Sequence, residues 1–289
     1  EPGTGPVAAP RRAGALLERI DRDLPALARE LIPRAPTASA SFLADPDGPE
    51  EHKPEWHQFG IITHTRRFVV ALRDEVPPAL WRIDAAIAGR VERYLDVPIG
   101  DLSRRDLTLV AGYWHDIGKF TTRTLGRRGD WRFRGHAGDS ARLITGERAD
   151  AADGLGARYG LDRAQIAYVA RLADLHYAPM ELKLAIDRSG GPAAAGDEYT
   201  QIAARLGDEG YAVCCLFWAD CVAKGDTPRQ IDGRPALWDL LGRTLRAVDR
   251  LRPADPGRAR RAAPTREPRA EGGDMVTAAN DLDLTIDGP

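Results

Sequence analysis

His115 and Asp116 are adjacent at the end of an apolar run, in the segment Leu109-Val-Ala-Gly-Tyr-Trp-His-Asp-Ile-Gly-Lys119. Neighbouring His and Asp side chains at the end of a helix can both bind one metal ion, because both supply ligand atoms that transition metals accept. The Asp carboxylate has a second oxygen that can bridge to another ion. This pair therefore predicts the nucleus of a metal site.

Further candidate ligands lie on, or at the ends of, other apolar segments. Asp220 falls inside an apolar run, where a carboxylate is costly unless it is paired or binds a metal. The complete candidate set has four imidazoles and two carboxylates: His64, His115, Asp116, His136, His176 and Asp220. Such a mixed nitrogen and oxygen set suits Mn, Fe, Co, Ni or Zn better than Mg alone. The other two histidines, His52 and His57, fall in an irregular region, and we expect them to lie outside the site.

Helical periodicity dominates the segments that must position these side chains. Ser103 and Asp162 are plausible N-caps, and the glycine of His-Asp-Ile-Gly is expected to end a helix. We expect helices over residues 16–31, 61–73, 78–95, 103–115, 136–145, 162–176, 210–223 and 235–251. A short β-hairpin is expected within residues 121–133, where Arg128-Gly129-Asp130 can form the turn. The predicted fold class is therefore all-α, with this hairpin as its exception.

Composition limits the domain organisation. The chain has 289 residues, of which 43% are hydrophobic and 29% charged, so it can build a sizeable core. Residues 1–13 are rich in Pro, Gly and Ala, and residues 253–289 are first rich in Pro, Arg and Gly and then acidic. We expect both stretches to be disordered, because neither can bury a core. One helical domain over residues 14–252 is the prediction.

Charge and cysteine content exclude several classes of protein. The formal net charge is −2, so the chain lacks the global basic field of a general nucleic-acid binder. No apolar run has the length of a membrane span, and no signal-peptide pattern is visible. The three cysteines, Cys214, Cys215 and Cys221, fit neither a zinc motif nor a disulfide framework. We expect a cytoplasmic protein with reduced, buried thiols and no membrane partner.

The order of the candidate ligands resembles that of the HD-domain metal-dependent phosphohydrolases. Among these, the chain looks most like the HD domain of bacterial tRNA nucleotidyltransferases, and a similar domain occurs in RNA end-healing enzymes. Four motifs carry the resemblance, which covers roughly residues 56–224: Thr63-His64-Thr65, the run from His115 to Thr124, Trp131-Arg-Phe-Arg-Gly-His136, and Trp218-Ala-Asp220. The nucleotidyltransferase domain itself has no counterpart in this sequence.

The resemblance implies a ligand set and an enzyme of a stated class. One metal ion would be held by His64, His115, Asp116 and Asp220. Asp116 would bridge to a second ion held by His136 and His176. Two divalent ions at this spacing can clamp a phosphate and activate a water molecule for in-line attack on phosphorus. A metal-dependent phosphohydrolase or phosphodiesterase is therefore expected, with Asp116 and Lys119 as its catalytic residues.

The stretch after the His-Asp pair suggests the substrate. Arginine suits bidentate contacts with phosphate, and aromatic rings can stack on a base. The expected substrate-binding residues are Lys119, Arg123, Arg132, Arg134 and Trp131. They favour a phosphorylated nucleotide or an RNA terminus as partner. By the resemblance, the favoured reactions are opening of a 2′,3′-cyclic phosphate and removal of a 2′-phosphate, which is a role in RNA processing.

Two other functions fit the same ligands. Some HD-domain proteins hold a mixed-valent di-iron centre and oxidise their substrate, and the order of the ligands is the same for both chemistries. Alternatively, the domain is a nucleotide-binding regulatory module without turnover. The sequence makes no prediction of the oligomeric state.

Overall fold

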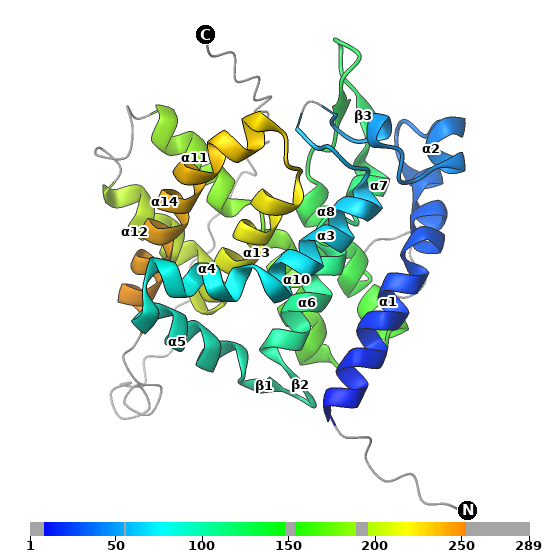
Figure 1. Ribbon diagram of the computed structural model, residues 1–289. Helices are drawn as coiled ribbons and strands as arrows, with labels where there is room; N and C mark the ends of the chain where they lie inside the picture. The colour runs from blue at the N-terminus through cyan, green and yellow to red at the C-terminus, as the bar shows by residue number, and fades with distance from the viewer. Residues whose placement is uncertain (1–8, 55, 148–153, 189–195, 253–289) are drawn as a thin grey trace, which may run out of the picture. The chain divides into compact units, whose positions relative to one another are not determined.

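The computed structural model describes residues 9–54, 56–147, 154–188 and 196–252. Helices make up most of this part of the chain, and its strands form two short antiparallel pairs (Figure 1). The described elements belong to one unit that ends at Leu251. This confirms the predicted all-α fold class with a short hairpin. The whole of the predicted disordered segment 253–289, and residues 1–8 of the segment 1–13, lie outside the described residues.

The described residues contain fourteen α-helices. They are α1 (Ala9–Leu31), α2 (Ala40–Ala44), α3 (Ile61–Asp74), α4 (Val76–Ile83), α5 (Ala85–Leu95), α6 (Arg104–Trp114), α7 (Lys119–Thr122), α8 (His136–Thr145), α9 (Leu155–Arg158), α10 (Arg163–Leu175), α11 (Ala178–Arg188), α12 (Gly196–Leu206), α13 (Gly210–Ala223) and α14 (Pro228–Leu251). Strands β1 (Pro98–Ile99) and β2 (Leu102–Ser103) form one pair, and β3 (Thr124–Leu125) and β4 (Trp131–Arg132) form the other. The second pair is the hairpin expected within residues 121–133.

Two helices begin at the caps that the sequence predicts. The Ser103 side chain accepts a hydrogen bond from the Asp106 backbone amide (3.1 Å), and the Asp106 carboxylate accepts one from the Ser103 amide (3.0 Å). Asp162 and Gln165 make the same reciprocal pair at the start of α10. These capping boxes satisfy backbone donors that have no partner in the first turn. The capping boxes fix where α6 and α10 begin. His115 and His176 are the C-cap residues at the opposite ends of these two helices.

The predicted single helix over residues 78–95 is wrong, because the chain forms two helices there. Asp84 adopts an extended conformation between α4 and α5. Its carboxylate accepts hydrogen bonds from the Ala86 amide (2.9 Å) and the Ile87 amide (3.0 Å). An Asp in this position starts a new helix at the cost of ending the previous one.

Two helices begin earlier than expected. Helix α1 begins at Ala9, inside the segment predicted to be disordered, and Pro10 lies in its first turn, where proline costs no hydrogen bond. Helix α14 begins at Pro228 rather than Pro235. Thr227 and Gln230 explain this start: the Thr227 amide donates to Gln230 Oε1 (3.0 Å), and the Gln230 amide donates to Thr227 Oγ1 (3.4 Å).

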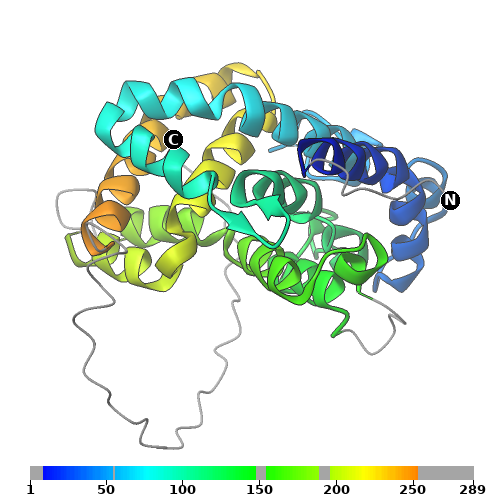
Figure 2. The same ribbon diagram turned by 90° about the horizontal axis from the view of Figure 1, so that it is seen from below.

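The helices that carry the candidate ligands pack against one another around α6. Helix α6 contacts both α3 and α10, while α3 also packs on α13 and α10 packs on α8. Figure 2 shows α6 between α3 (cyan) and α10 (green). Helix α13 is buried on nearly every face, including Cys214, Cys215 and Cys221, which form no disulfide. None of the described helices is long and apolar enough to cross a bilayer.

Candidate metal centre

All six histidines of the chain lie in one group of ring contacts. The side chains come from α3, from the ends of α6 and α10, from the start of α8 and from the loop before α3. The distances between ring centroids are 3.9 Å for His52–His57, 4.9 Å for His57–His64, 5.7 Å for His64–His115, 5.0 Å for His115–His176 and 5.2 Å for His136–His176. Five of these histidines are buried, and the His136 side chain is 15% exposed.

Asp116 lies at the centre of this group and is itself buried. Its Oδ2 atom is 3.2 Å from His115 Nε2 and 3.5 Å from His64 Nε2. Its Oδ1 atom is 3.3 Å from His136 Nε2 and 3.8 Å from His176 Nε2. Each oxygen therefore faces a different pair of imidazoles. The ligand atoms of His64, His115 and Asp116, and those of Asp116, His136 and His176, lie within 4.8 Å of one another, so these buried clusters could hold a metal ion.

Hydrogen bonds to the backbone fix the orientation of three of these rings. The bonds run from His115 Nδ1 to the Gly112 carbonyl (2.7 Å), from His136 Nδ1 to the Phe133 carbonyl (2.8 Å) and from His176 Nδ1 to the Ala173 carbonyl (2.7 Å). A carbonyl oxygen only accepts, so Nδ1 carries the proton and Nε2 of each neutral ring has a free lone pair. Metal-binding histidines are commonly oriented by such a second bond.

The lone pairs face other lone pairs rather than donors. His136 Nε2 and His176 Nε2 are 3.3 Å apart, and both point at the Asp116 carboxylate. Burial, then the neighbouring His115 and His136, lower the pKa of His176 to about 3. Protonation of His176, which would turn one of these lone pairs into a donor, is therefore disfavoured. Nε2 of His64 and Nε2 of His115 have no hydrogen-bond partner, and Oδ2 of Asp116 is paired with the Lys119 ammonium group at 2.7 Å. Buried polar atoms without partners are rare, and a bound cation would satisfy all of these.

Both candidate carboxylates remain ionised. Burial alone would raise the pKa of Asp116, but Lys119, whose Nζ is 2.7 Å from Oδ2, and then His115 lower that pKa well below its usual value. For Asp220, burial is likewise overcome by Lys224 (2.8 Å) and then by His64 (3.2 Å). Ionised carboxylates next to unprotonated imidazoles are the species that bind divalent cations.

Gly118 allows α8 to approach the turn that follows the His-Asp pair. Its amide donates to Ser140 Oγ (2.9 Å), and that hydroxyl donates to the His115 carbonyl (2.8 Å). A Cβ atom at position 118 would lie 2.3 Å from the His136 carbonyl oxygen and 2.7 Å from the Ser140 amide nitrogen. Both are backbone atoms, which cannot move independently of the helix. The turn therefore needs glycine to hold His136 against Asp116.

Gly118→Ala is expected to lower both stability and metal content. The added methyl group must push α8 away, which costs about 1–3 kcal/mol in a packed interior and moves His136 from Asp116. Gly138→Ala on the same helix is the matched control, because its Cβ would meet only side-chain atoms at 3.7 Å and 3.8 Å. Urea unfolding and elemental analysis measure both effects. Equal metal content and stability in the two variants would contradict this role of Gly118.

The predicted ligands meet as expected, and Lys119 lies beside them. Asp220 contacts the group through His64, whose Nε2 is 3.2 Å from Asp220 Oδ1. The Asp220 side chain is 14% exposed, so it lies at the edge of the centre. Two residues that we expected outside the site, His52 and His57, also belong to the cluster. The error has a physical cause: they lie in a loop without periodicity, and only its packing against α3 brings them to the site. The signal that could have placed them at the site was their residue type, because the chain has only six histidines and the other four were already candidate ligands.

The structure places Arg123, one of the predicted substrate-binding residues, in the interior of the protein. Arg123 is fully buried and pairs with Glu51. Its guanidinium stacks on Trp131 (3.3 Å to the ring centroid) and on Phe42 (4.1 Å). The same contact occupies one face of Trp131, which was expected to stack on a base. Arginine is readily enclosed by aromatic rings because its guanidinium is planar and weakly hydrated.

The remaining predicted substrate contacts differ in exposure. Arg132 is partly buried and pairs with Asp130, whose Oδ2 is 3.0 Å from Arg132 Nε. Arg134 is exposed, two residues before His136. Arg134 is therefore the arginine of the predicted set that faces solvent near the start of α8.

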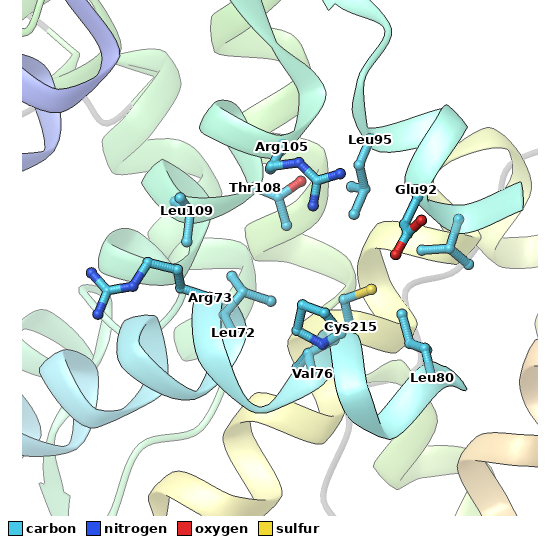
Figure 3. Close-up of a pocket in the computed structure, with 12 residues that line it drawn as sticks. Leu72, Arg73, Val76, Leu80, Glu92, Leu95, Arg105, Thr108, Leu109 and Cys215 are labelled. Carbon is cyan, nitrogen blue, oxygen red and sulfur yellow. The ribbon is translucent and has the colours of Figure 1, made fainter. Parts of the chain in front are cut away.

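A separate apolar pocket lies at the other ends of α3 and α6, away from His64 and His115 (Figure 3). Its walls include Leu72, Val76, Leu80, Leu95, Leu109 and Cys215, and none of the candidate ligands lines it.

Comparisons with protein-family models and with curated proteins found no match to this chain.

Proposed function

We propose that this protein is a metal-dependent phosphohydrolase of the HD-domain type, acting on a phosphorylated nucleotide or an RNA terminus. The observation that carries the proposal is the arrangement around Asp116, whose two oxygens face two separate pairs of imidazole Nε2 atoms. A carboxylate with a pair of nitrogen ligands on each oxygen has the donor set for two cations that share it.

The proposed ions are divalent transition metals, from among Mn, Ni, Co, Fe and Zn. His64, His115 and Asp116 would hold the first ion, with Asp220 beside His64, and Asp116, His136 and His176 would hold the second. When bound, such ions supply a Lewis acid that polarises a phosphoryl group and lowers the pKa of water. The protein orients the ligands through the Nδ1 bonds and keeps the centre largely buried.

Two lysines flank the centre and support a phosphate-bearing substrate. Lys119 lies 2.7 Å from Asp116 Oδ2, and Lys224 lies 2.8 Å from Asp220 Oδ2. Either ammonium group can neutralise charge on phosphate oxygens as it develops. Tyr177, 37% exposed, has its ring 6.0 Å from that of His136, where it can stack on a base. These groups, with Arg134, favour a nucleotide or RNA end over a small phosphoester.

The test is hydrolysis by purified full-length protein with a defined metal. Protein loaded in turn with Mn, Ni, Co, Fe or Zn is assayed on phosphomonoesters, 2′,3′-cyclic nucleotides and 2′-phosphorylated RNA ends, and its metal content is measured. We expect metal-dependent release of phosphate or opening of the cyclic phosphate. Activity that requires iron and oxygen would instead support the di-iron oxygenase. Tight nucleotide binding without turnover would support the regulatory module.

Lys119→Met is expected to leave metal content unchanged and to weaken phosphate binding by roughly tenfold or more, because a charge-assisted contact is lost. Methionine keeps the buried alkyl stem of the side chain. Lys183→Met is the control, since Lys183 pairs with Asp187 on the same helix (2.5 Å). Calorimetric titration with inorganic phosphate measures the change. Unaltered phosphate affinity in Lys119→Met would remove Lys119 from the proposed substrate contacts.

A further inference from the structure

His52 presents a hydrogen-bond acceptor to Lys119 inside the protein. The side chain is 1% exposed. Its Nδ1 is 3.0 Å from the Phe59 carbonyl, so Nδ1 is the donor and Nε2 the acceptor of the neutral ring. Nε2 is 3.1 Å from Lys119 Nζ. Burial, then Lys119 and His64, lower the pKa of His52 well below its usual value, in agreement with a neutral ring.

The surroundings of His52 hold this acceptor in place. Its ring stacks on His57 at 3.9 Å and meets the edge of Phe133 at 5.7 Å. The preceding residue, Glu51, pairs with the buried Arg123. The loop that carries His52 is thus anchored to the connection between α7 and β3, close in sequence to Lys119.

Lys119 has two different partners at its Nζ atom. One is Asp116 Oδ2 at 2.7 Å, and the other is His52 Nε2 at 3.1 Å. Asp116 Oδ2 is also the oxygen that faces His64 and His115, the nitrogen ligands of the proposed first ion. An oxygen that binds a cation is less available to an ammonium group. His52 is the partner of Lys119 that does not belong to the proposed ligand set.

We propose that His52 is a positioning residue that holds the Lys119 ammonium group beside the metal centre, where it binds a phosphate oxygen of the substrate. This inference rests on the proposed function, because it concerns the same site. His52 itself contacts neither metal nor substrate. Any effect of His52 on phosphate affinity therefore acts through Lys119. Substitution of Lys119 must abolish that effect.

A double-mutant cycle tests this directly. His52→Phe keeps the ring that stacks on His57 but removes the acceptor, and His52→Gln offers both an amide donor and a carbonyl acceptor. Each substitution is made in the wild-type and in the Lys119→Met background of the full chain. Mn content is measured first, and the affinity for inorganic phosphate is then measured by calorimetry on Mn-loaded protein.

We expect His52→Phe to weaken phosphate binding about fivefold to tenfold, the loss of one hydrogen bond, at unchanged Mn content. His52→Gln should restore most of the phosphate affinity. In the Lys119→Met background, neither substitution should change the phosphate affinity. An equal loss from His52→Phe in both backgrounds would overturn the inference, as would wild-type affinity in His52→Phe. If His52→Phe does not fold, His52→Ala, which also removes the acceptor that faces Lys119, takes its place in both backgrounds. A loss of phosphate affinity confined to the background that keeps Lys119 supports the coupling, and equal losses in the two backgrounds overturn it.

The result is separable from that for the proposed function, because phosphate binding does not require turnover. Wild-type protein that binds phosphate through His52 and Lys119 but hydrolyses no phosphoester would overturn the proposed function alone. Hydrolysis with no coupling between His52 and Lys119 would overturn the inference alone. Wild-type protein that binds no phosphate would overturn both.

Discussion

Asp116→Ala is expected to abolish turnover and to remove most of the bound metal. Asp116 is the residue common to both ligand groups, and each of its oxygens faces two imidazole nitrogens. Loss of a group that only orients a ligand typically costs ten- to a hundredfold in metal affinity or activity, so loss of the shared ligand should exceed about a hundredfold. Elemental analysis after purification without added metal, together with the hydrolysis assay, measures both effects.

Asp139→Asn is the matched control for this prediction. Asp139 is also buried and lies on α8, but it accepts hydrogen bonds from Thr121 and from Arg142 (2.9 Å) and belongs to neither ligand group. Asparagine keeps an acceptor there, so metal content should remain as in the wild type. Asp116→Ala with normal metal content and a near-normal rate would refute a centre built on Asp116.

Glu51→Ala is expected to cause the largest loss of stability. It leaves Arg123 buried between Trp131 and Phe42 without its carboxylate partner. Removing one partner of a buried ion pair typically costs about 3–5 kcal/mol, because the charge that remains is neither solvated nor paired. The free energy of unfolding in urea, measured on metal-free protein, gives the effect independently of the metal site.

Two further variants separate this cause from a general effect of losing an ion pair. Asp239→Ala removes the exposed partner of Arg243 on α14 and should cost no more than about 1 kcal/mol. Combining Glu51→Ala with Arg123→Met removes both charges and should recover part of the loss, because no unpaired charge is left inside. A cost of Glu51→Ala similar to that of Asp239→Ala would show that Arg123 finds solvent when Glu51 is removed.

Several helices and most of the candidate ligands could be predicted from the sequence, because their determinants are local. The boundaries of α8 and α13 match the predicted segments, and the capping boxes at Ser103 and Asp162 begin α6 and α10 as expected. A cap acts within three residues, and helical periodicity within about four. Asp220 could be predicted because a carboxylate in an apolar helix needs a partner wherever that helix packs.

The contacts of the loop before α3 could be decided only by the tertiary structure. Glu51 pairs with Arg123 across 72 positions, and His52 meets Lys119 across 67. Whether an arginine in a hairpin faces phosphate or is enclosed by Trp131 depends on what packs against it.

The sequence by itself therefore determined that His64, His115, Asp116, His136 and His176 lie at helix positions suited to ligands. The tertiary structure decided that two pairs of imidazoles face the two oxygens of Asp116. It also decided which cation remains beside them: Lys119 is held at the centre, while Arg123 is enclosed in the core. The physical reason is that helix caps and apolar periodicity act along the chain, whereas burial and charge pairing depend on the residues that packing brings together.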